Sequence, residues 1–301
     1  MIRLQYTEFL DKPQQFLSLT GLSVEEFDSL LTAFSTTWDD HTRHFTIMGE
    51  ARKRKVRKER KNSQLPTTGD KLFFVLYQFK NNCLQESLAA QFGMAQPHAC
   101  FWLQLLSKLL KKTLNRVGVL PERRADRINR ALAGYDEVII DGTERPIGRS
   151  TDNETQKEDY SGKKKRHCIK NMVLTAKNGM ILFLSPTYCG SVHDKTIADE
   201  QNFQFNRVIT LLQDTGFQGY KPENAIIIQP EKKPRNKELT QDQKDSNKAI
   251  AKQRVYVEHS IGGFKVWRVA KEVCRTWVHD TRDDYVFIAC GLHNFKIKCR
   301  A

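Results

Sequence analysis

Three acidic residues of this chain stand where separate structural elements could bring their carboxylates together. Asp141 follows the apolar run 138–140 and Asp214 follows the run 208–213, so each comes at the end of a predicted strand. Glu258 lies in a later stretch of helical character. If the two strands are neighbours, Asp141 and Asp214 emerge at the same edge of a sheet. Carboxylates packed so closely repel one another, and Mg²⁺ is a counterion that suits a site made only of oxygen ligands.

Each acid also has an ordinary structural explanation. Asp141 and Asp214 stand just before glycine-containing turns, which either residue could simply open. Glu258 follows Arg254 by four residues, so the two could form a salt bridge on a helix surface. Asp194 precedes another predicted helix and is open to three interpretations: a helix N-cap, an accessory metal ligand, or the second metal ligand in place of Asp214. We favour Asp214 as the second ligand, because its strand is expected beside that of Asp141.

The charge of the chain indicates the kind of partner. The sequence contains 49 Lys and Arg against 35 Asp and Glu, which gives a net charge of +14. Neutralising phosphates releases counterions and drives binding, so this excess favours a polyanion, with a merely basic protein as the alternative. A metal-dependent acidic site in such a chain predicts an enzyme that cuts DNA.

Length and cysteine content narrow the class of protein. The 301 residues suffice for one large domain or two ordinary ones. The seven cysteines form no C-x-x-C pair and are odd in number, so we expect free thiols rather than a zinc site or a disulfide framework. The chain has no signal-peptide-like start and no apolar run of about 20 residues. We therefore expect a cytoplasmic, nucleoid-associated protein without a membrane partner.

A basic segment interrupts the amino-terminal part of the chain, residues 1–134, which is otherwise predicted to be helical. Eight of the ten residues at 52–61 are Lys or Arg, and such a block repels itself and cannot form core. It is either a solvated linker or an arm that holds DNA phosphates. In the second case the candidate contacts are Arg52, Lys53, Arg54 and Lys55.

The segment 70–115 has the pattern of a helix-turn-helix. It holds three helical stretches, the first beginning from an Asp70 cap and the last two separated by a short turn that contains glycine. Gln96, His98 and Trp102 fall near the start of the third stretch, where a recognition helix faces base edges. Any small helical bundle has such turns, which is the competing interpretation.

Residues 135–301 have the pattern of an α/β domain. Lys177-Asn178-Gly179 predicts a tight hairpin between two strands. The expected strands lie at 137–141, 167–176, 180–187, 208–213 and 225–229, with helices at 194–203 and 240–262. This succession predicts a mixed sheet flanked by helices and is similar to the ribonuclease-H-like fold. In that fold the first and fourth strands lie side by side, so the adjacency expected here is an inference from fold analogy.

Several sequence blocks together resemble the DDE-type transposases of bacterial insertion sequences, in the branch close to the PIF/Harbinger transposases. The blocks are Val-Ile-Ile-Asp141-Gly-Thr-Glu-Arg-Pro, Tyr160-Ser-Gly-Lys-Lys-Lys-Arg-His, Gly190-Ser-Val-His-Asp, Asp214-Thr-Gly-Phe-Gln-Gly, Pro230-Glu-Lys-Lys-Pro and Arg254-Val-Tyr-Val-Glu-His-Ser-Ile-Gly. The amino-terminal half resembles the helix-turn-helix domain that accompanies this nuclease. The resemblance therefore covers nearly the whole chain.

The resemblance implies roles for these residues. Asp141, Asp214 and Glu258 would be the DDE triad and would hold two divalent ions, Mg²⁺ or Mn²⁺. One ion would activate water and later a DNA 3′-hydroxyl, and the other would stabilise the leaving oxygen. Arg254 and Lys265 would position phosphates.

A second basic cluster and the expected partners complete the prediction. Lys163, Lys164, Lys165 and Arg166 are expected to meet the DNA backbone, with a solvated loop as the alternative. The partner would be double-stranded DNA, both the terminal inverted repeats and the target, with at least a homodimer formed on it. Two other functions stay open: a catalytically silent DNA-binding protein derived from a transposase, and a host DNA nuclease of the same fold.

Overall fold

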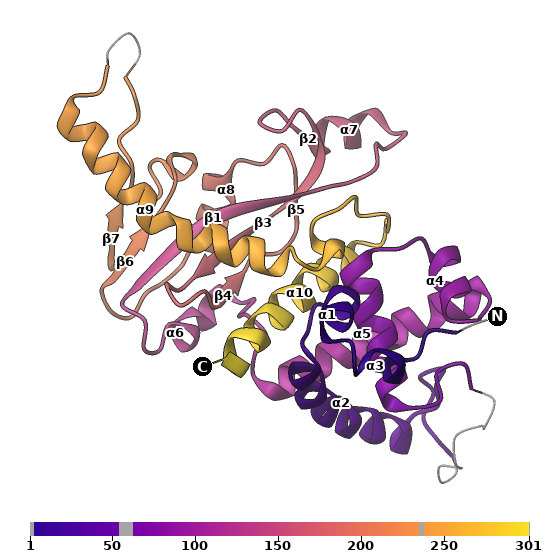
Figure 1. The fold of residues 1–301 in the computed structure, drawn as a ribbon. Coiled ribbons are helices and arrows are strands. Elements are labelled where there is room, and N and C mark those ends of the chain that lie inside the picture. The colour runs from indigo at the N-terminus through magenta and orange to yellow at the C-terminus, as the bar shows by residue number, and fades with distance from the viewer. Residues whose placement is uncertain (1–2, 54–62, 235–237, 301) are drawn as a thin grey trace. The chain divides into compact units, whose positions relative to one another are not determined.

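Two units of different character make up the chain (Figure 1). The computed structural model describes residues 3–53, 63–234 and 238–300. The helical unit comprises Met1–Leu120, Val266–Ala270 and Asp284–Ala301, and the sheet unit comprises Pro121–Lys265 and Lys271–Asp283. This division differs from the boundary expected after residue 134.

The carboxyl-terminal helix explains part of that difference. Its later residues close the helical unit: Gly291 lies against Leu114 and Leu120, and the Asn294 side chain donates to the Val119 carbonyl at 3.0 Å. All seven cysteines are free thiols, as predicted. In the part of the chain that the structure describes, no helix is long and apolar enough to cross a membrane. Arg54 and Lys55 of the basic segment lie outside the described residues.

The helical unit is built from helices that pack against one another. They are α1 (Pro13–Thr20), α2 (Val24–His44), α3 (Thr68–Asn81), α4 (Gln85–Gln91), α5 (Gln96–Val117) and the later part of α10 (His279–Arg300), with short 3₁₀ turns at Tyr6–Phe9 and Arg268–Ala270. The predicted cap of α3 at Asp70 is wrong. Thr67 is the N-cap, and the Asp70 carboxylate reaches back to the Thr67 amide at 3.1 Å, which completes a capping box.

Trp102 of α5 belongs to the core of the helical unit. Its side chain is only 8% exposed, and its ring lies 6.2 Å from that of Trp38 on α2. The prediction that Trp102 faces base edges is therefore wrong, because its indole is used to pack α5 against α2. Gln96 and His98, one turn earlier, remain at least partly exposed.

The sheet unit holds a mixed sheet flanked by helices, as predicted, although the sheet has seven strands where the sequence indicated five. Its strands are β1 (Glu137–Pro146), β2 (Tyr160–Ser161), β3 (Arg166–Thr175), β4 (Ile181–Leu184), β5 (Tyr188–Cys189), β6 (Ile209–Leu212) and β7 (Ala225–Ile228). Its helices are α6 (Ile128–Ala131), α7 (Asn153–Asp159), α8 (Asp194–Gln201) and α9 (Gln241–Phe264), with 3₁₀ turns at Ala125–Arg127 and Thr215–Phe217. The order is β2-β3-β1-β6-β7, and β4 and β5 also pair with β3.

The register of β1 determines where the acids emerge. β1 runs parallel to β6, so the expected adjacency of the first and fourth strands is confirmed. Ile139 pairs with Leu212, and Asp141 and Asp214 therefore both lie two residues beyond the last pair. The prediction that β1 ends at Asp141 is wrong: the strand continues to Pro146 because β3 pairs with it along that whole length.

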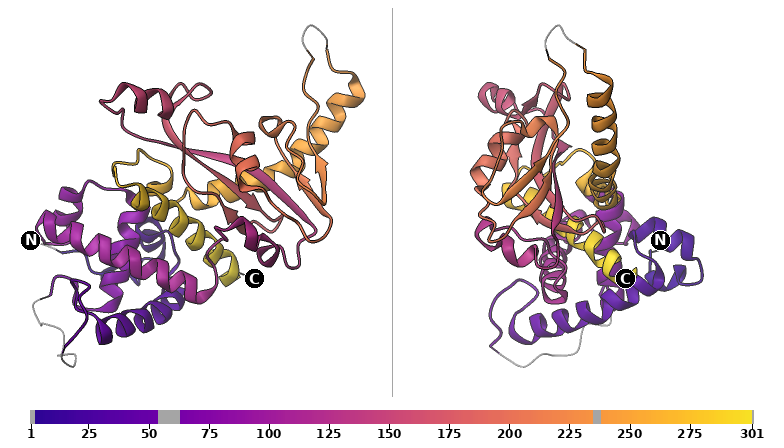
Figure 2. Two further views of the ribbon diagram at one scale, coloured as in Figure 1. Left: turned by 180° about the vertical axis from the view of Figure 1, so that it is seen from behind. Right: turned by 90° about the vertical axis from the view of Figure 1, so that its left-hand side faces the viewer.

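The two faces of β1 are buried in different ways. Val138 and Ile140 join the core that includes Ile197 of α8. Ile139 points to the opposite face, where it is completely buried and where α9 runs along the sheet (Figure 2). Because side chains alternate along a strand, Asp141 shares the α9 face with Ile139.

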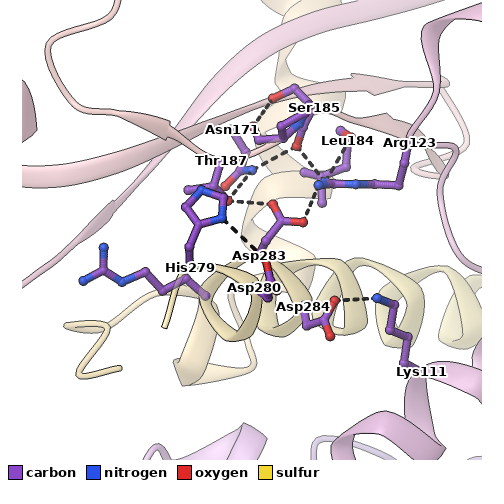
Figure 3. A network of polar contacts seen from close by, with 12 residues as sticks. Lys111, Arg123, Asn171, Leu184, Ser185, Thr187, His279, Asp280, Asp283 and Asp284 are labelled. Atoms are coloured by element: carbon purple, nitrogen blue, oxygen red, sulfur yellow. Dashed lines mark hydrogen bonds and ion pairs between the residues drawn. The ribbon is translucent and has the colours of Figure 1, made fainter. Parts of the chain in front are cut away.

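A buried polar network joins the sheet to the first turn of α10 within the sheet unit (Figure 3). Asn171 of β3 donates to the Ser185 carbonyl at 3.0 Å and to Thr187 Oγ1 at 3.1 Å. Thr187 Oγ1 in turn donates to Asp283 at 2.8 Å, and Arg123 forms an ion pair with the same carboxylate. The Asp283 carboxylate thus accepts hydrogen bonds from two side chains that are far apart in the sequence.

We expect Asp283→Ala to lower the free energy of unfolding by about 2–3 kcal/mol, because two partly buried donors lose a charged acceptor. Urea denaturation of the full chain measures the change. Asp280→Ala removes a fully exposed carboxylate from the same helical turn and serves as the matched control, with a clearly smaller loss. Equal losses in the two variants would mean that the network contributes nothing beyond the helix dipole.

Candidate active site

Asp141 and Asp214 share one cation. Arg254 of α9 places its guanidinium 3.4 Å from Asp141 Oδ2 and 3.5 Å from Asp214 Oδ1. The backbone following each acid orients it further: the Gly142 amide donates to Asp141 Oδ1 at 2.8 Å, and the Thr215 amide donates to Asp214 Oδ1 at 2.6 Å. The parallel register and these amides hold the two carboxylates on either side of the same guanidinium.

Asp194 reaches the same place from α8. It is the first residue of that helix, and His193 occupies the N-cap position, so the capping interpretation of Asp194 is wrong. A Cβ atom at Gly142 would lie 2.9 Å from Asp194 Oδ1, and one at Gly216 would lie 3.2 Å from Asp194 Oδ2. The two glycines therefore leave the space that the Asp194 carboxylate fills, directly beside the backbone segments that carry the other two acids.

A buried lysine holds Asp194 and a further acid that the sequence analysis missed. Lys170 of β3 lies 3.5 Å from Asp194 Oδ1 and 3.8 Å from Glu144 Oε1, and it donates to the Val192 carbonyl at 2.9 Å. Glu144 and Lys170 are direct partners across the β1–β3 ladder. A charged residue of opposite sign in each of two apolar strands could have indicated this ion pair. The pairing can be predicted, however, only once the antiparallel register of the two strands is known.

α9 supplies the remaining candidates. The helix persists through Gly262 and ends at Phe264, so Arg254 and Glu258 do lie one turn apart on one continuous helix. Glu258 is exposed, and its carboxylate has no hydrogen-bond or ion-pair partner among the described residues. Lys265 caps the helix and donates to the Glu144 carbonyl at 3.2 Å. The pKa of Lys265 is lowered to about 8, chiefly by burial and to a smaller extent by the nearby charges of Arg145 and Lys164.

A basic turn lines the same cavity as these acids. Lys163, Lys164 and Lys165 form the exposed turn between β2 and β3, and Arg166 begins β3. The cavity has a volume of about 340 Å³ and is lined by Asp141, Gly142, Thr143, Glu144, Lys163, Lys164, Arg166, Asp194, Asp214, Arg254, Glu258, Ile261 and Lys265. Lys165 is the one member of the predicted basic cluster that does not line it. Acidic and basic walls therefore enclose a single space within the sheet unit.

Burial chiefly sets the pKa of Asp141. The pKa of this carboxyl is raised from 3.8 to about 6: burial raises it most, Arg254 and the Gly142 amide lower it, and the neighbouring Asp214 and Asp194 make smaller raising contributions. Any additional cation that approaches this carboxyl would stabilise its ionised form.

The oxygen-rich donor set fits a divalent metal ion such as Mg²⁺. The side chains in the cavity lining that could coordinate a metal ion are carboxylates, and the lining includes neither His193 nor His259. Oxygen ligands of this kind suit Mg²⁺. As the side chains stand, the described residues contain no group of three or more His, Cys, Asp or Glu that could hold a metal. Arg254 occupies the position between Asp141 and Asp214 instead.

The other predicted DNA contacts lie in the helical unit. His98 is exposed at the start of α5 and lines, with Arg3, a cavity of about 930 Å³. Gln96 donates to the Gln85 side chain across the turn between α4 and α5. Arg52 donates to the Phe45 carbonyl at 2.8 Å, and Lys53 is exposed.

Comparison with known proteins decides the family. Residues 140–294, just over half of the chain, match the DDE superfamily endonuclease family. The chain belongs to this family. It is therefore an enzyme of the endonuclease and transposase class. Asp141, Asp194, Asp214 and Glu258 all lie within the matched segment.

A curated relative extends the similarity beyond the matched segment. This DDE endonuclease is 23% identical over 260 residues to the probable transposase for insertion sequence element IS702 of Microchaete diplosiphon, which covers 85% of this chain and 91% of the relative. No solved structure matches it.

Asp141 should make the stability of this endonuclease pH-dependent in a chelating buffer. Its folded-state pKa of about 6 lies above the ordinary 3.8, so the folded protein binds this proton more tightly than the unfolded chain. The stabilising contribution is complete below about pH 4 and is lost as the pH rises to about 6. Relative to Asp141→Asn, we expect the unfolding free energy to fall by about 1–3 kcal/mol across this window in EDTA. Parallel wild-type and variant curves would contradict the shift.

Proposed function

We propose that this endonuclease is a transposase, which cleaves DNA strands at the ends of its own element and joins those ends to target DNA. The observation that carries the proposal is the position of Asp141 and Asp214, two residues beyond the last β1–β6 pair and joined by Arg254. Family membership and the name of the curated relative support the same reaction class. The fold of the sheet unit is proposed to be ribonuclease-H-like.

The acids are proposed to share the metal-binding role. Asp141, Asp214 and Glu258 would hold two divalent ions, Mg²⁺ or Mn²⁺, and Asp194 would be an accessory ligand or the alternative to Asp214. Such ions supply activation of the attacking oxygen and stabilisation of the leaving oxygen. The chain's own part is to hold carboxylates of separate elements within one cavity: β1 contributes Asp141 and Glu144, and α8, α9 and the turn after β6 contribute one each.

The basic residues are proposed to hold the DNA backbone over the acids. Lys163, Lys164 and Arg166 line the same cavity as the carboxylates, and Lys265 lines it from the end of α9. Charged donors of this kind fix the register of a duplex without reading its sequence. The scissile phosphate would therefore be positioned by the turn between β2 and β3.

The helical unit is proposed to bind the terminal repeats. α4, the turn at Gly93 and α5 have the order of a helix-turn-helix, with Gly93 at a positive φ of 62°. Gln96 and His98 would approach base edges, and Arg52 and Lys53 with their neighbours Arg54 and Lys55 would contact phosphates. Bringing two element ends together requires at least a dimer on DNA.

Asp214→Asn is expected to reduce Mg²⁺-dependent cleavage and joining at the terminal repeats by at least about 100-fold, a loss typical of a disturbed metal site. DNA binding in Ca²⁺ should persist, and Asp126→Asn, an exposed acid elsewhere in the sheet unit, should behave as wild type. Gel assays of nicked and joined products give both readouts. Normal activity of Asp214→Asn together with loss in Asp194→Asn would move the second ligand to Asp194. Cleavage without any joined product would indicate a plain nuclease.

Lys164→Ala is expected to weaken DNA binding and to reduce the slope of log affinity against log salt by about 1, because one phosphate contact is lost. Fluorescence anisotropy over a salt series measures the slope. Lys157→Ala removes the same charge from exposed α7 and should leave the slope unchanged. An identical effect of both variants would mean that only the net charge matters.

A further inference from the structure

The guanidinium of Arg254 is held in an unusual way. Its two contacts, 3.4 Å to Asp141 and 3.5 Å to Asp214, are longer than the roughly 2.7–2.9 Å of a tight charged hydrogen bond. Its Nε atom is buried and has no hydrogen-bond partner, and the side chain is only 14% exposed. The two carboxylates are therefore what holds this cation, and they hold it loosely.

The same carboxylates are the proposed metal ligands. A divalent ion between Asp141 and Asp214 would need the oxygen atoms that now face the guanidinium, and two cations cannot share that space without strong repulsion. Arg254 and the metal ion are thus in competition for one anionic pair.

We propose that Arg254 is an internal counterion that a divalent cation must displace, and that the displaced guanidinium passes to a phosphate of the bound DNA. This rests on the metal centre proposed above. Arg254 lines the same cavity as the basic turn at Lys163 and Lys164, so a phosphate held by that turn comes within the space that the guanidinium can reach. A planar guanidinium suits a phosphate as well as it suits paired carboxylates.

Coupling between the two ligands follows from this exchange. A phosphate that draws Arg254 away leaves the acids with two uncompensated charges, which raises their affinity for the metal ion. By reciprocity the metal ion must raise the affinity for DNA by the same factor. The two acids would then stay paired with Arg254 until DNA and metal arrive together.

Calcium affinity of the full chain without DNA tests the competition directly. Isothermal titration calorimetry should find Ca²⁺ bound about tenfold more tightly by Arg254→Met than by wild type, since the competing cation is gone. Arg124→Met removes the same charge from an exposed position and should leave the affinity unchanged. Weaker or unchanged binding by Arg254→Met would overturn the proposal, because Arg254 would then support the metal site or have no influence on it.

Arg254→Lys keeps the charge but cannot bridge both carboxylates, and its Ca²⁺ affinity should fall between those of the other two proteins. This variant carries the test if Arg254→Met does not fold. Adding duplex DNA should tighten Ca²⁺ binding more in wild type than in either variant, and equal tightening would refute the transfer to phosphate. Absence of any Ca²⁺ binding in wild type and in both variants, with and without DNA, would instead remove the metal centre itself, so the two failures are distinguishable.

Discussion

The parallel pairing of β1 with β6 is the constraint on which the acidic centre depends. Three backbone pairs set the register, and they place Asp141 and Asp214 at the same level beyond the end of the ladder. β1 then continues alone along β3, which leaves its other edge free for the turn after β6. A shift of one residue would turn Asp141 toward the apolar core of α8.

Charge balance explains the arrangement around that edge. Asp141 and Asp214 share Arg254, and Asp194 and Glu144 share Lys170, so each pair of acids has a resident cation. Glu258 alone lies exposed and unpaired among the described acids of the cavity. The absence of side chains at Gly142 and Gly216 lets Asp194 approach the others. The two resident cations thus reduce the repulsion among the crowded carboxylates, and further cations would stabilise this centre.

The sequence predicted the acids but not how they meet. Asp141 and Asp214 could be found because each follows an apolar run and stands close before a glycine, although the turn expected after Asp141 is in fact a continuation of β1. Their adjacency needed a fold analogy, since parallel pairing between strands so far apart in the chain leaves no local signal. Glu144 and Lys170 escaped notice because their pairing depends on the register of β3. Trp102 was misplaced because a position near a helix start does not reveal which face is buried, and in this case Trp38 covers it.

Iron-mediated cleavage tests most directly whether Asp141, Asp214 and Glu258 form one metal centre. Fe²⁺ replaces Mg²⁺, and the positions at which the resulting hydroxyl radicals cut the chain are mapped. The account predicts cuts around residues 141 and 214 and along α9 near residue 258, all suppressed by excess Mg²⁺. Cuts that spare residues 214 and 258, or that persist in excess Mg²⁺, would contradict it.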